Sequence, residues 1–170
     1  VFNDRMWVMG GKDNTNIYND IWSSTDGIHW NLETAEAPWS KRQLFSMLVV
    51  HDGKLWLFGG GITVYHPYRS YRDVWSSSDG KNWKKVTDLA PWPGRTWSTA
   101  AAYKNRLWVL SGFRAEPTWN NFNDVWYSAD GAEWRELTTI IPAWEPRHEI
   151  SAYVFRDRLW VVAGNAWPLM

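Results

Sequence analysis

The 170-residue sequence predicts an all-β fold, a β-propeller that forms a partial ring of about three and a half four-stranded antiparallel blades. Two observations predict it. Thirteen of the sixteen tryptophans recur at four places in a unit of about fifty residues, a period typical of propeller blades. Within each unit, short runs of β-branched and aromatic residues alternate with glycine-containing turns, as strands joined by hairpins do.

The repeated tryptophans define the unit and its strands. The second strand carries Trp7, Trp56, Trp108 and Trp160; the third carries Trp22, Trp75 and Trp126; the fourth carries Trp30, Trp83 and Trp134; and the link to the next unit carries Trp39, Trp92 and Trp144. A buried tryptophan contributes up to about 250 Å² of contact. We therefore expect these side chains to pack one sheet against the next.

The second unit illustrates the expected strands in order, at residues 44–51, 54–58, 73–77 and 82–86. Asp52-Gly53 joins the first pair and Asp79-Gly80 the second pair, and both dipeptides favour tight hairpin turns because they tolerate positive φ. Antiparallel hairpins turn at alternating ends. The long link at 61–71 and the links between units therefore lie at the same end, which carries most of the variation between units.

The same strands define the expected domain organisation. A single partial propeller over residues 1–170 contains an incomplete blade with strands two to four, two complete blades, and an incomplete blade with strands one and two, at residues 1–35, 43–88, 96–139 and 149–164. Because the ends fall inside a unit, we interpret the chain as a piece of a longer protein. Ring closure then requires further chain or self-association through the open blade edges. A second copy fits poorly, because both ends supply a second strand and neither adds the lacking third and fourth strands.

Composition excludes several functions. Eighteen basic residues balance eighteen acidic ones, so no net field favours nucleic acid or an anionic membrane. The sequence has no cysteine for disulfides or thiolate metal sites, and its four histidines lack metal-ligand spacing. Neither a nucleophile elbow nor a phosphate-binding glycine loop is present. We therefore predict no catalytic residue, no metal and no cofactor.

The sequence resembles the kelch family of β-propellers over essentially its whole length, and within it a bacterial type. The resemblance rests on an aromatic residue before the third strand, a tryptophan in the fourth, and a glycine doublet after the second. The doublet varies as Gly10-Gly11, Gly59-Gly60, Ser111-Gly112 and Ala163-Gly164. The Ser-x-Asp-Gly-x-x-Trp turns also resemble a shortened Asp-box of sialidase-like propellers. The resemblance implies a fold more than a function, since kelch-like propellers serve as binding scaffolds, carbohydrate-active enzymes and structural modules.

Aromatic and charged residues outside the repeat positions are the candidate binding residues. They are expected at the variable end and comprise Trp97, Trp119, Trp167, Tyr65, His66, Tyr68, Arg69, Arg114, His148 and Glu149, with Phe113 and Glu116 beside them. Aromatic rings interleaved with Arg, Glu and His suit a sugar, or a peptide with hydrophobic anchors. The alternative is that the long loops fold back and bury their own aromatic side chains.

An arginine also recurs three residues after each link tryptophan, as Arg42, Arg95 and Arg147. Facing the central channel, these guanidinium groups would hold a carboxylate ligand. A residue repeated in every unit is explained more simply by a role within the unit. That role would be stacking on the neighbouring tryptophan, or pairing with the repeated aspartates Asp20, Asp73 and Asp124.

Several functional hypotheses remain. The first is a non-catalytic binding or scaffold module that recognises a protein or a carbohydrate through the variable end. The alternative is a carbohydrate-active enzyme of the mutarotase or oxidase type, which would gather Arg147, His148 and Glu149 in a deep pocket, the last two as an acid–base pair. A third is an architectural repeat in a surface protein, and a location outside the cytoplasm or at the cell surface is slightly favoured.

Overall fold

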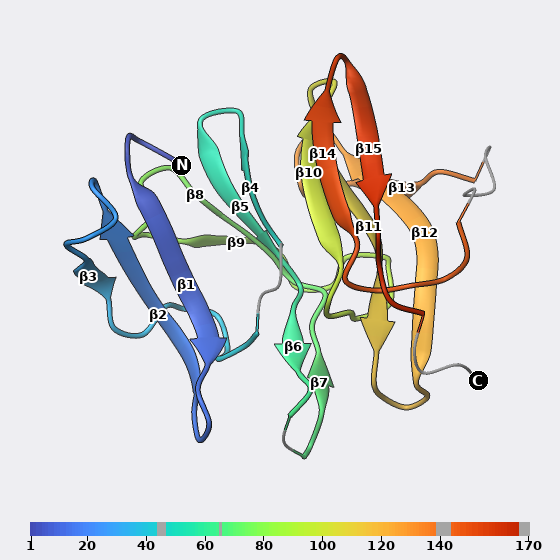
Figure 1. Ribbon diagram of the computed structural model, residues 1–170, viewed down its shortest axis with the longest axis horizontal. Coiled ribbons are helices and arrows are strands. Elements are labelled where there is room, and N and C mark those ends of the chain that lie inside the picture. Colours follow the sequence, from blue (N-terminus) through green and yellow to red (C-terminus); the bar gives the residue numbers. More distant parts are fainter. Residues whose placement is uncertain (44–46, 65, 139–143, 167–170) are drawn as a thin grey trace.

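The computed structural model describes residues 1–43, 47–64, 66–138 and 144–166, where the regular elements are all β-strands (Figure 1). The strands are β1 (Met6–Lys12), β2 (Ile17–Ser24), β3 (Asn31–Thr34), β4 (Leu48–His51), β5 (Lys54–Phe58), β6 (Gly61–Ile62), β7 (Arg69–Ser70), β8 (Val74–Ser77), β9 (Lys84–Thr87), β10 (Thr99–Tyr103), β11 (Arg106–Arg114), β12 (Asn120–Ser128), β13 (Trp134–Glu136), β14 (Ser151–Phe155) and β15 (Arg158–Val162). The described part of the chain contains no helix long and apolar enough to cross a membrane.

The strands form small antiparallel sheets in the orders β1-β2-β3, β4-β5-β8-β9, β10-β11-β12-β13 and β14-β15, and β6-β7 is a short extra hairpin. The all-β prediction is therefore confirmed, and the sheets are consistent with a β-propeller. The described residues do not close a ring, so the number of blades stays a prediction.

The first strands of successive sheets lie next to one another. Strand β10 contacts β4 on one side and β14 on the other, and the remaining strands fan outward from them (Figure 1). A cavity of about 290 Å³ lies between these three strands, lined by residues that include Leu48, Thr99 and Ser151. The first strands thus converge on a shared space, as the inner strands of a propeller do around its channel.

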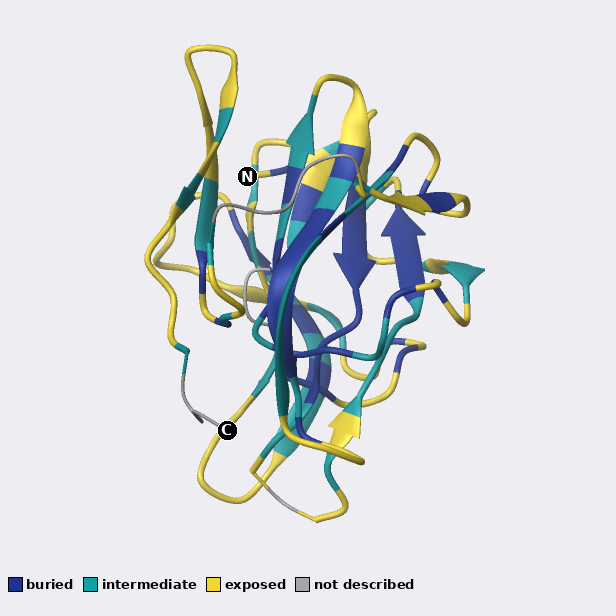
Figure 2. Cartoon of the chain, turned by 90° about the vertical axis from the view of Figure 1, so that its right-hand side faces the viewer, coloured by how far each residue is buried: buried dark blue, intermediate teal, exposed yellow. Residues whose placement is uncertain are grey.

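Apolar side chains fill the space between neighbouring sheets, and the most buried strands are β5, β8 and β11, in the dark blue interior of Figure 2. Between the first two sheets, Ile21 packs with Leu57. The link tryptophans belong to these cores. Trp39 meets Trp83 edge to face at 4.6 Å between ring centroids, and Trp92 meets its counterpart in the next sheet in the same way at 4.3 Å. The repeated indoles therefore join one sheet to the next.

A repeated glycine lets two of the second-strand tryptophans, Trp7 and Trp56, reach the neighbouring sheet. The Trp56 ring lies directly against Gly131, and Trp7 lies in the same way against Gly80, so that a Cβ atom on either glycine would overlap the indole. Both glycines also have positive φ, 76° and 80°. Glycine is required here for two independent reasons, the backbone conformation and the close approach of the ring.

The turn between the third and fourth strands is wider than the tight hairpin turn expected at Asp79-Gly80 between strands at 73–77 and 82–86. Residues 78–83 separate β8 from β9. Ser77 Oγ accepts hydrogen bonds from the amides of Asp79 and Gly80, while Asp79 Oδ1 accepts from those of Lys81 and Asn82. Side chains that bond the local backbone favour such a wider turn. The expectation was wrong because it counted only the positive-φ glycine.

Other strand limits also shift. The second strand lies at residues 54–58, as expected, but the fourth begins at Lys84 because the wide turn holds residues 81 and 82. The described first strand covers Leu48–His51, and residues 44–46 lie outside the described residues. Strands β11 and β12 extend as a long hairpin past the glycine position, and β6-β7 forms a similar arm.

Replacing Asp79 by asparagine is expected to lower the free energy of unfolding at pH 7, because the charged oxygen that accepts from the Lys81 and Asn82 amides becomes neutral. Solvent weakens charge-assisted bonds in this exposed turn, so the loss is at most about 1 kcal/mol. Partial burial raises the pKa of Asp79, but hydrogen bonds from Asn82 and Lys81 lower it further, to about 2. A carboxyl pKa below its unfolded value stabilises the fold above the unfolded pKa, and this contribution is lost as the pH falls through the folded pKa.

The wild-type free energy of unfolding should therefore decrease between about pH 5 and pH 2, and it should decrease less steeply in Asp79→Asn. Urea unfolding at a series of pH values measures both slopes. Asp88→Asn provides the control, since Asp88 is exposed and pairs with Lys85 on the surface. Equal pH slopes for wild type and Asp79→Asn would contradict the assigned hydrogen bonds.

Candidate functional site

The loops between the second and third strands and the links between sheets lie on one face of the protein, at the bottom in Figure 1. Each link between sheets forms a backbone bridge with the residue that follows the repeated glycine doublet, in the pairs Gln43–Gly61, Thr96–Phe113 and His148–Asn165. Residues from two loops of each unit are thereby held together. We call this surface the loop face.

Two of the three recurring arginines at the edge of this face, Arg42 and Arg95, form buried ion pairs. Arg95 is fully buried, and its two terminal nitrogens donate to the two carboxylate oxygens of Asp124 at 2.6 and 2.7 Å. It also donates to the Ser111 carbonyl oxygen and lies 4.6 Å from the centre of the Phe122 ring. Trp126 Nε1 donates to the same carboxylate at 2.7 Å. The group is thus satisfied within the protein and is not presented to a ligand.

Arg42 repeats this arrangement with Asp73, at 2.6 and 2.9 Å, above the ring of Tyr71. Pairing with the repeated aspartate is therefore the alternative that the structure shows for both arginines. The stacking partner is the aromatic residue before the third strand instead of a tryptophan. Arg147 differs, because among the described residues its side chain donates only to the carbonyl oxygen of Glu145.

The candidate aromatic residues gather into one connected group on the loop face. In its inner part, the half-buried Trp97 stacks on Phe113 at 5.2 Å and on His148 at 4.9 Å between ring centroids. Phe113 and His148 are almost completely inaccessible. Here the alternative of loops that bury their own aromatics is the one observed. We call these three residues the inner stack.

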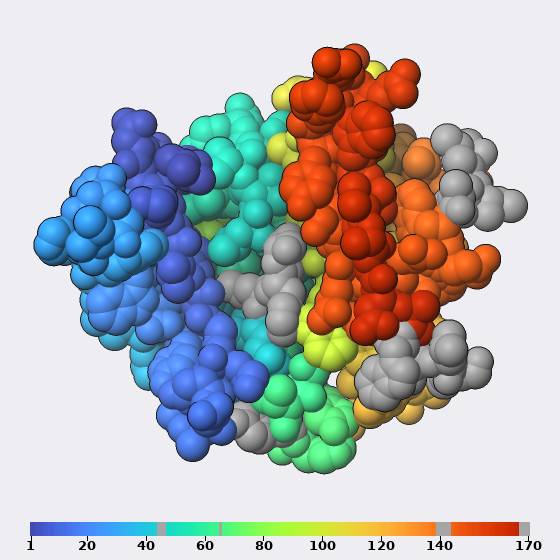
Figure 3. Space-filling view, viewed as in Figure 1, coloured from blue at the N-terminus to red at the C-terminus, as the bar shows by residue number. Residues whose placement is uncertain are grey.

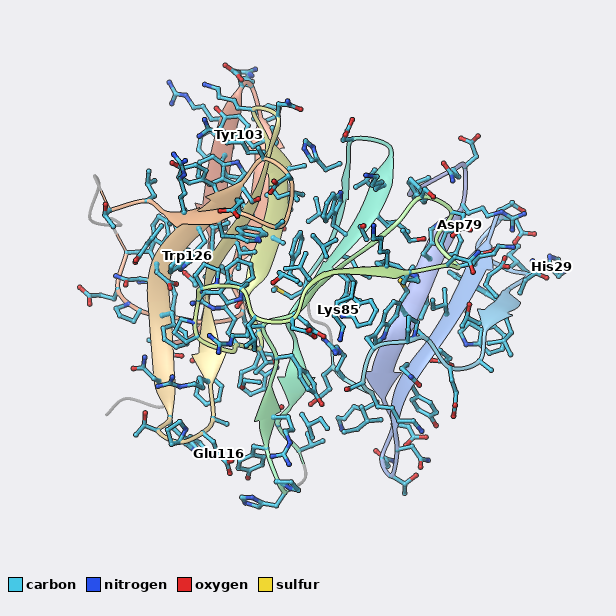
Figure 4. All side chains as sticks on the ribbon, turned by 180° about the vertical axis from the view of Figure 1, so that it is seen from behind. His29, Asp79, Lys85, Tyr103, Glu116 and Trp126 are labelled. Atoms are coloured by element: carbon cyan, nitrogen blue, oxygen red, sulfur yellow. The ribbon has the colours of Figure 1, made fainter. Side chains whose placement is uncertain are left out.

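The outer part of the group is accessible to solvent. Trp119 meets the inner stack edge to face at Phe113, 5.8 Å between centroids, and meets Tyr68 at 6.4 Å. His66 lies over Tyr68 at 4.0 Å, with its Nδ1 3.9 Å from Glu116 Oε1. Glu116 is labelled in Figure 4, on the arm between β11 and β12 and beside the β6-β7 arm. We call Trp119, Tyr68 and His66 the outer aromatic patch.

The inner stack depends on a residue that sequence reasoning did not select. Asn121 Oδ1 lies 2.7 Å from His148 Nδ1. Burial lowers the pKa of His148, and the nearby charge of Glu149 raises it by less. Burial therefore favours the neutral form of the histidine, whose ring is hydrogen-bonded to an amide. Asn121 lies at a position that varies between units. The one sequence signal that places it near the loops is that it directly precedes Phe122, the aromatic residue before the third strand.

The remaining candidates are distributed around the outer patch or away from it. Arg69 is exposed on the β6-β7 arm and donates to the Tyr68 carbonyl oxygen, and Arg114 donates to Thr118 at the tip of the β11-β12 arm. Glu149 is exposed, and its amide bonds to the Trp97 carbonyl oxygen. Tyr65 and Trp167 lie outside the described residues.

The fold and the loop face together define an all-β repeat protein whose loop face carries a connected group of accessible aromatic residues. Comparison with known proteins gives a distant relative: alpha-scruin of Limulus polyphemus, a kelch-repeat protein, is 26% identical over 173 residues. The match covers 96% of this chain and 18% of alpha-scruin, so the chain spans about a fifth of that protein's length. No family model matches the chain.

Proposed function

We propose that the chain is a non-catalytic binding module that recognises a protein partner through the outer aromatic patch. The observation that carries the proposal is the meeting of Trp119, Tyr68 and His66 across two arms that belong to different sheets. Residues of one unit alone would not form this surface. The distant similarity to a kelch-repeat protein supports a binding role and leaves the partner open.

The composition of the patch suits protein recognition. Tryptophan, tyrosine and arginine are the residues that most often contribute large shares of binding energy at protein interfaces. Trp119 is 40% exposed, and Arg69 and Glu116 provide charges of both signs nearby. The inner stack supports the patch from below. A rigid support reduces the entropy that is lost when the exposed side chains become ordered on binding.

Ring geometry favours a protein over a carbohydrate ligand. A sugar stacks on an open aromatic face, but His66 covers Tyr68 at 4.0 Å, and Trp119 meets Tyr68 at 72°. The catalytic alternative requires an accessible His148, whereas this side chain is buried and bonded to Asn121. A carbohydrate-active enzyme is therefore the less supported proposal.

Replacing Trp119 by alanine is expected to weaken protein binding at least about tenfold, because a central aromatic anchor would be removed. Peptides selected from a phage-displayed library on the wild-type protein serve as ligands, and their affinities are measured by biolayer interferometry. Phe155→Ala is the matched control, since Phe155 is an exposed aromatic residue at the tip of the β14-β15 hairpin, on the opposite rim.

A glycan array probed with wild type and with the Trp119→Ala, Tyr68→Ala double variant separates the ligand classes. Glycans bound only by wild type would replace the protein proposal by a carbohydrate one. Selected peptides that bind wild type and Trp119→Ala equally would exclude the outer aromatic patch as the site.

A further inference from the structure

Arg114 is a charged residue of the loop face that the repeat does not explain. It is the last residue of β11 and pairs with Asn120 across the β11-β12 arm. The same position holds Ile62 in the preceding unit and Ala166 in the following one, so the strands form there without an arginine. A residue that one unit alone carries is not needed for the architecture that all units share.

The guanidinium group of Arg114 is poorly satisfied. One terminal nitrogen donates to Thr118 Oγ1 at 3.4 Å, which is long for a hydrogen bond, and the guanidinium carbon lies 5.8 Å from the centre of the Phe122 ring. Its Nε is buried without a hydrogen-bond partner, and Arg114 forms no ion pair among the described residues. Arg95 meets the same ring at 4.6 Å, but its charge is balanced by Asp124. The charge of Arg114 is not balanced in this way.

Arg114 faces the space between two complete sheets. The Phe122 ring that it approaches is also the ring under Arg95, which belongs to the link between β9 and β10. The two sheets joined by this link, β4-β5-β8-β9 and β10-β11-β12-β13, both have four strands. The surroundings of Arg114 are therefore formed by the middle of the chain and do not depend on the first or the last sheet.

Two hydroxyl groups in the same space between sheets also lack partners. Ser70 Oγ and Thr96 Oγ1 are buried without a hydrogen-bond partner in the described part of the chain. They occupy the positions of Asn121 and His148, which bond to each other between the next two sheets, and the shorter serine and threonine side chains do not make that contact. Buried polar groups are nearly always hydrogen-bonded. Three such atoms, with the Nε of Arg114, favour a polar group from outside the chain in this space.

The terminal nitrogens of Arg114 lie beside the outer aromatic patch. The two arms that carry the patch are neighbours at the bottom of Figure 3, β6-β7 in green and β11-β12 in yellow. Thr118, which accepts from Arg114, is exposed and directly precedes Trp119. Glu116, the acidic residue of the β11-β12 arm, lies near His66 of the other arm instead of pairing with Arg114. A partner that covers the aromatic rings therefore places its own groups next to an unpaired guanidinium.

We propose that Arg114 binds the side-chain carboxylate of an aspartate or glutamate of the protein partner, next to the apolar group that covers Trp119. A guanidinium holds a carboxylate through two parallel hydrogen bonds, as Arg95 holds Asp124 in this protein. The docked partner shields the pair from water, which weakens exposed ion pairs. The inference rests on the function proposed above and names the chemistry of the partner: an acidic residue beside a hydrophobic anchor.

The test uses the peptides selected by phage display on the wild-type protein. Each is synthesised with an amidated C-terminus, so that only side chains contribute carboxylates, and again with the Asp or Glu nearest its apolar anchor changed to Asn or Gln. Biolayer interferometry measures both forms on wild type, Arg114→Gln and Arg114→Lys, and tryptophan fluorescence checks that each variant is folded. Arg135→Gln is the control, because Arg135 is an exposed arginine of the same sheet, on its fourth strand.

We expect Arg114→Gln to weaken binding of the acidic peptide at least about tenfold, because one partner of a shielded ion pair is removed. The amide peptide should bind wild type and Arg114→Gln with equal affinity, since the two changes remove the same pair. Arg114→Lys keeps the charge without the planar fork, so it should lose less than Arg114→Gln. Arg135→Gln should bind the acidic peptide as wild type does.

Selected peptides without an acidic residue, or equal binding of the acidic peptide to wild type and Arg114→Gln, would overturn the inference. If Trp119→Ala still weakens binding of those peptides, the outer aromatic patch remains the binding site and only the carboxylate contact is wrong. If Trp119→Ala leaves their binding unchanged, the proposed function itself fails. Should Arg114→Gln prove to be unfolded, Arg114→Lys and the amide peptide on wild type decide: equal affinities in both comparisons would also overturn the inference.

Discussion

Replacing Arg95 by alanine is expected to lower the free energy of unfolding by about 3 to 5 kcal/mol, since the change leaves a partly buried carboxylate without its counter-charge. Arg95 is completely buried and donates twice to Asp124 and once to the Ser111 carbonyl oxygen. Its backbone bonds to the preceding sheet through Tyr71. The side chain thus connects two sheets, and its loss removes charge pairing, hydrogen bonds and packing together.

Urea unfolding followed by tryptophan fluorescence measures this loss. Arg69→Ala is the control, because Arg69 is exposed and a surface change of this kind costs within about 0.5 kcal/mol. The double variant Arg95→Ala, Asp124→Ala should lose less than the sum of the single variants by more than about 1 kcal/mol, as coupled partners do. Additive losses, or an Arg95→Ala cost below about 1 kcal/mol, would show that solvent screens the pair.

Replacing Gly131 by alanine is expected to lower the free energy of unfolding by about 2 to 4 kcal/mol. The added Cβ atom overlaps the Trp56 ring, and overfilling a packed contact costs about 1 to 3 kcal/mol. The residue also has φ of 76°, where any side chain adds roughly 1 kcal/mol of backbone strain. Both costs fall on the contact between two neighbouring sheets.

Gly53→Ala separates the two causes. Gly53 has φ of 65° and no atom within 4 Å of the added Cβ, so only the strain of roughly 1 kcal/mol applies. A second comparison introduces Gly131→Ala into a Trp56→Phe background, where the smaller ring should reduce the cost towards that of Gly53→Ala. Equal losses at Gly131 and Gly53 in the wild-type background would refute the packing contribution.

Some features followed directly from the residues. The 54–58 strand lies where it was expected, because its apolar residues and the Asp52-Gly53 turn act locally: Asp52 and Gly53 have φ of 47° and 65°, as a two-residue hairpin requires. The turn at Asp79 was misjudged, since serine and aspartate side chains bond the backbone there and widen it. Turn geometry was predictable where the backbone alone decides it, and was missed where side chains do.

In the candidate site, the structure separates residues that the sequence did not distinguish. Trp97 and His148 were selected for the same reasons as Trp119 and Tyr68, yet the first two are in the inner stack and the last two in the outer aromatic patch. No local feature distinguishes them. Their exposure depends on how the arms of two sheets cross the links between sheets, which is set by residues far apart in the chain.

The sequence by itself determined the strand content, the repeat period and the tryptophan positions that pack the sheets, because turn chemistry and apolar alternation act over a few residues. The tertiary structure alone decided which carboxylate each arginine holds and which aromatic rings reach solvent. These outcomes depend on burial between segments about thirty residues apart in sequence: Arg42 pairs with Asp73 and Arg95 with Asp124, whereas among the described residues the Arg147 side chain donates only to the Glu145 carbonyl oxygen.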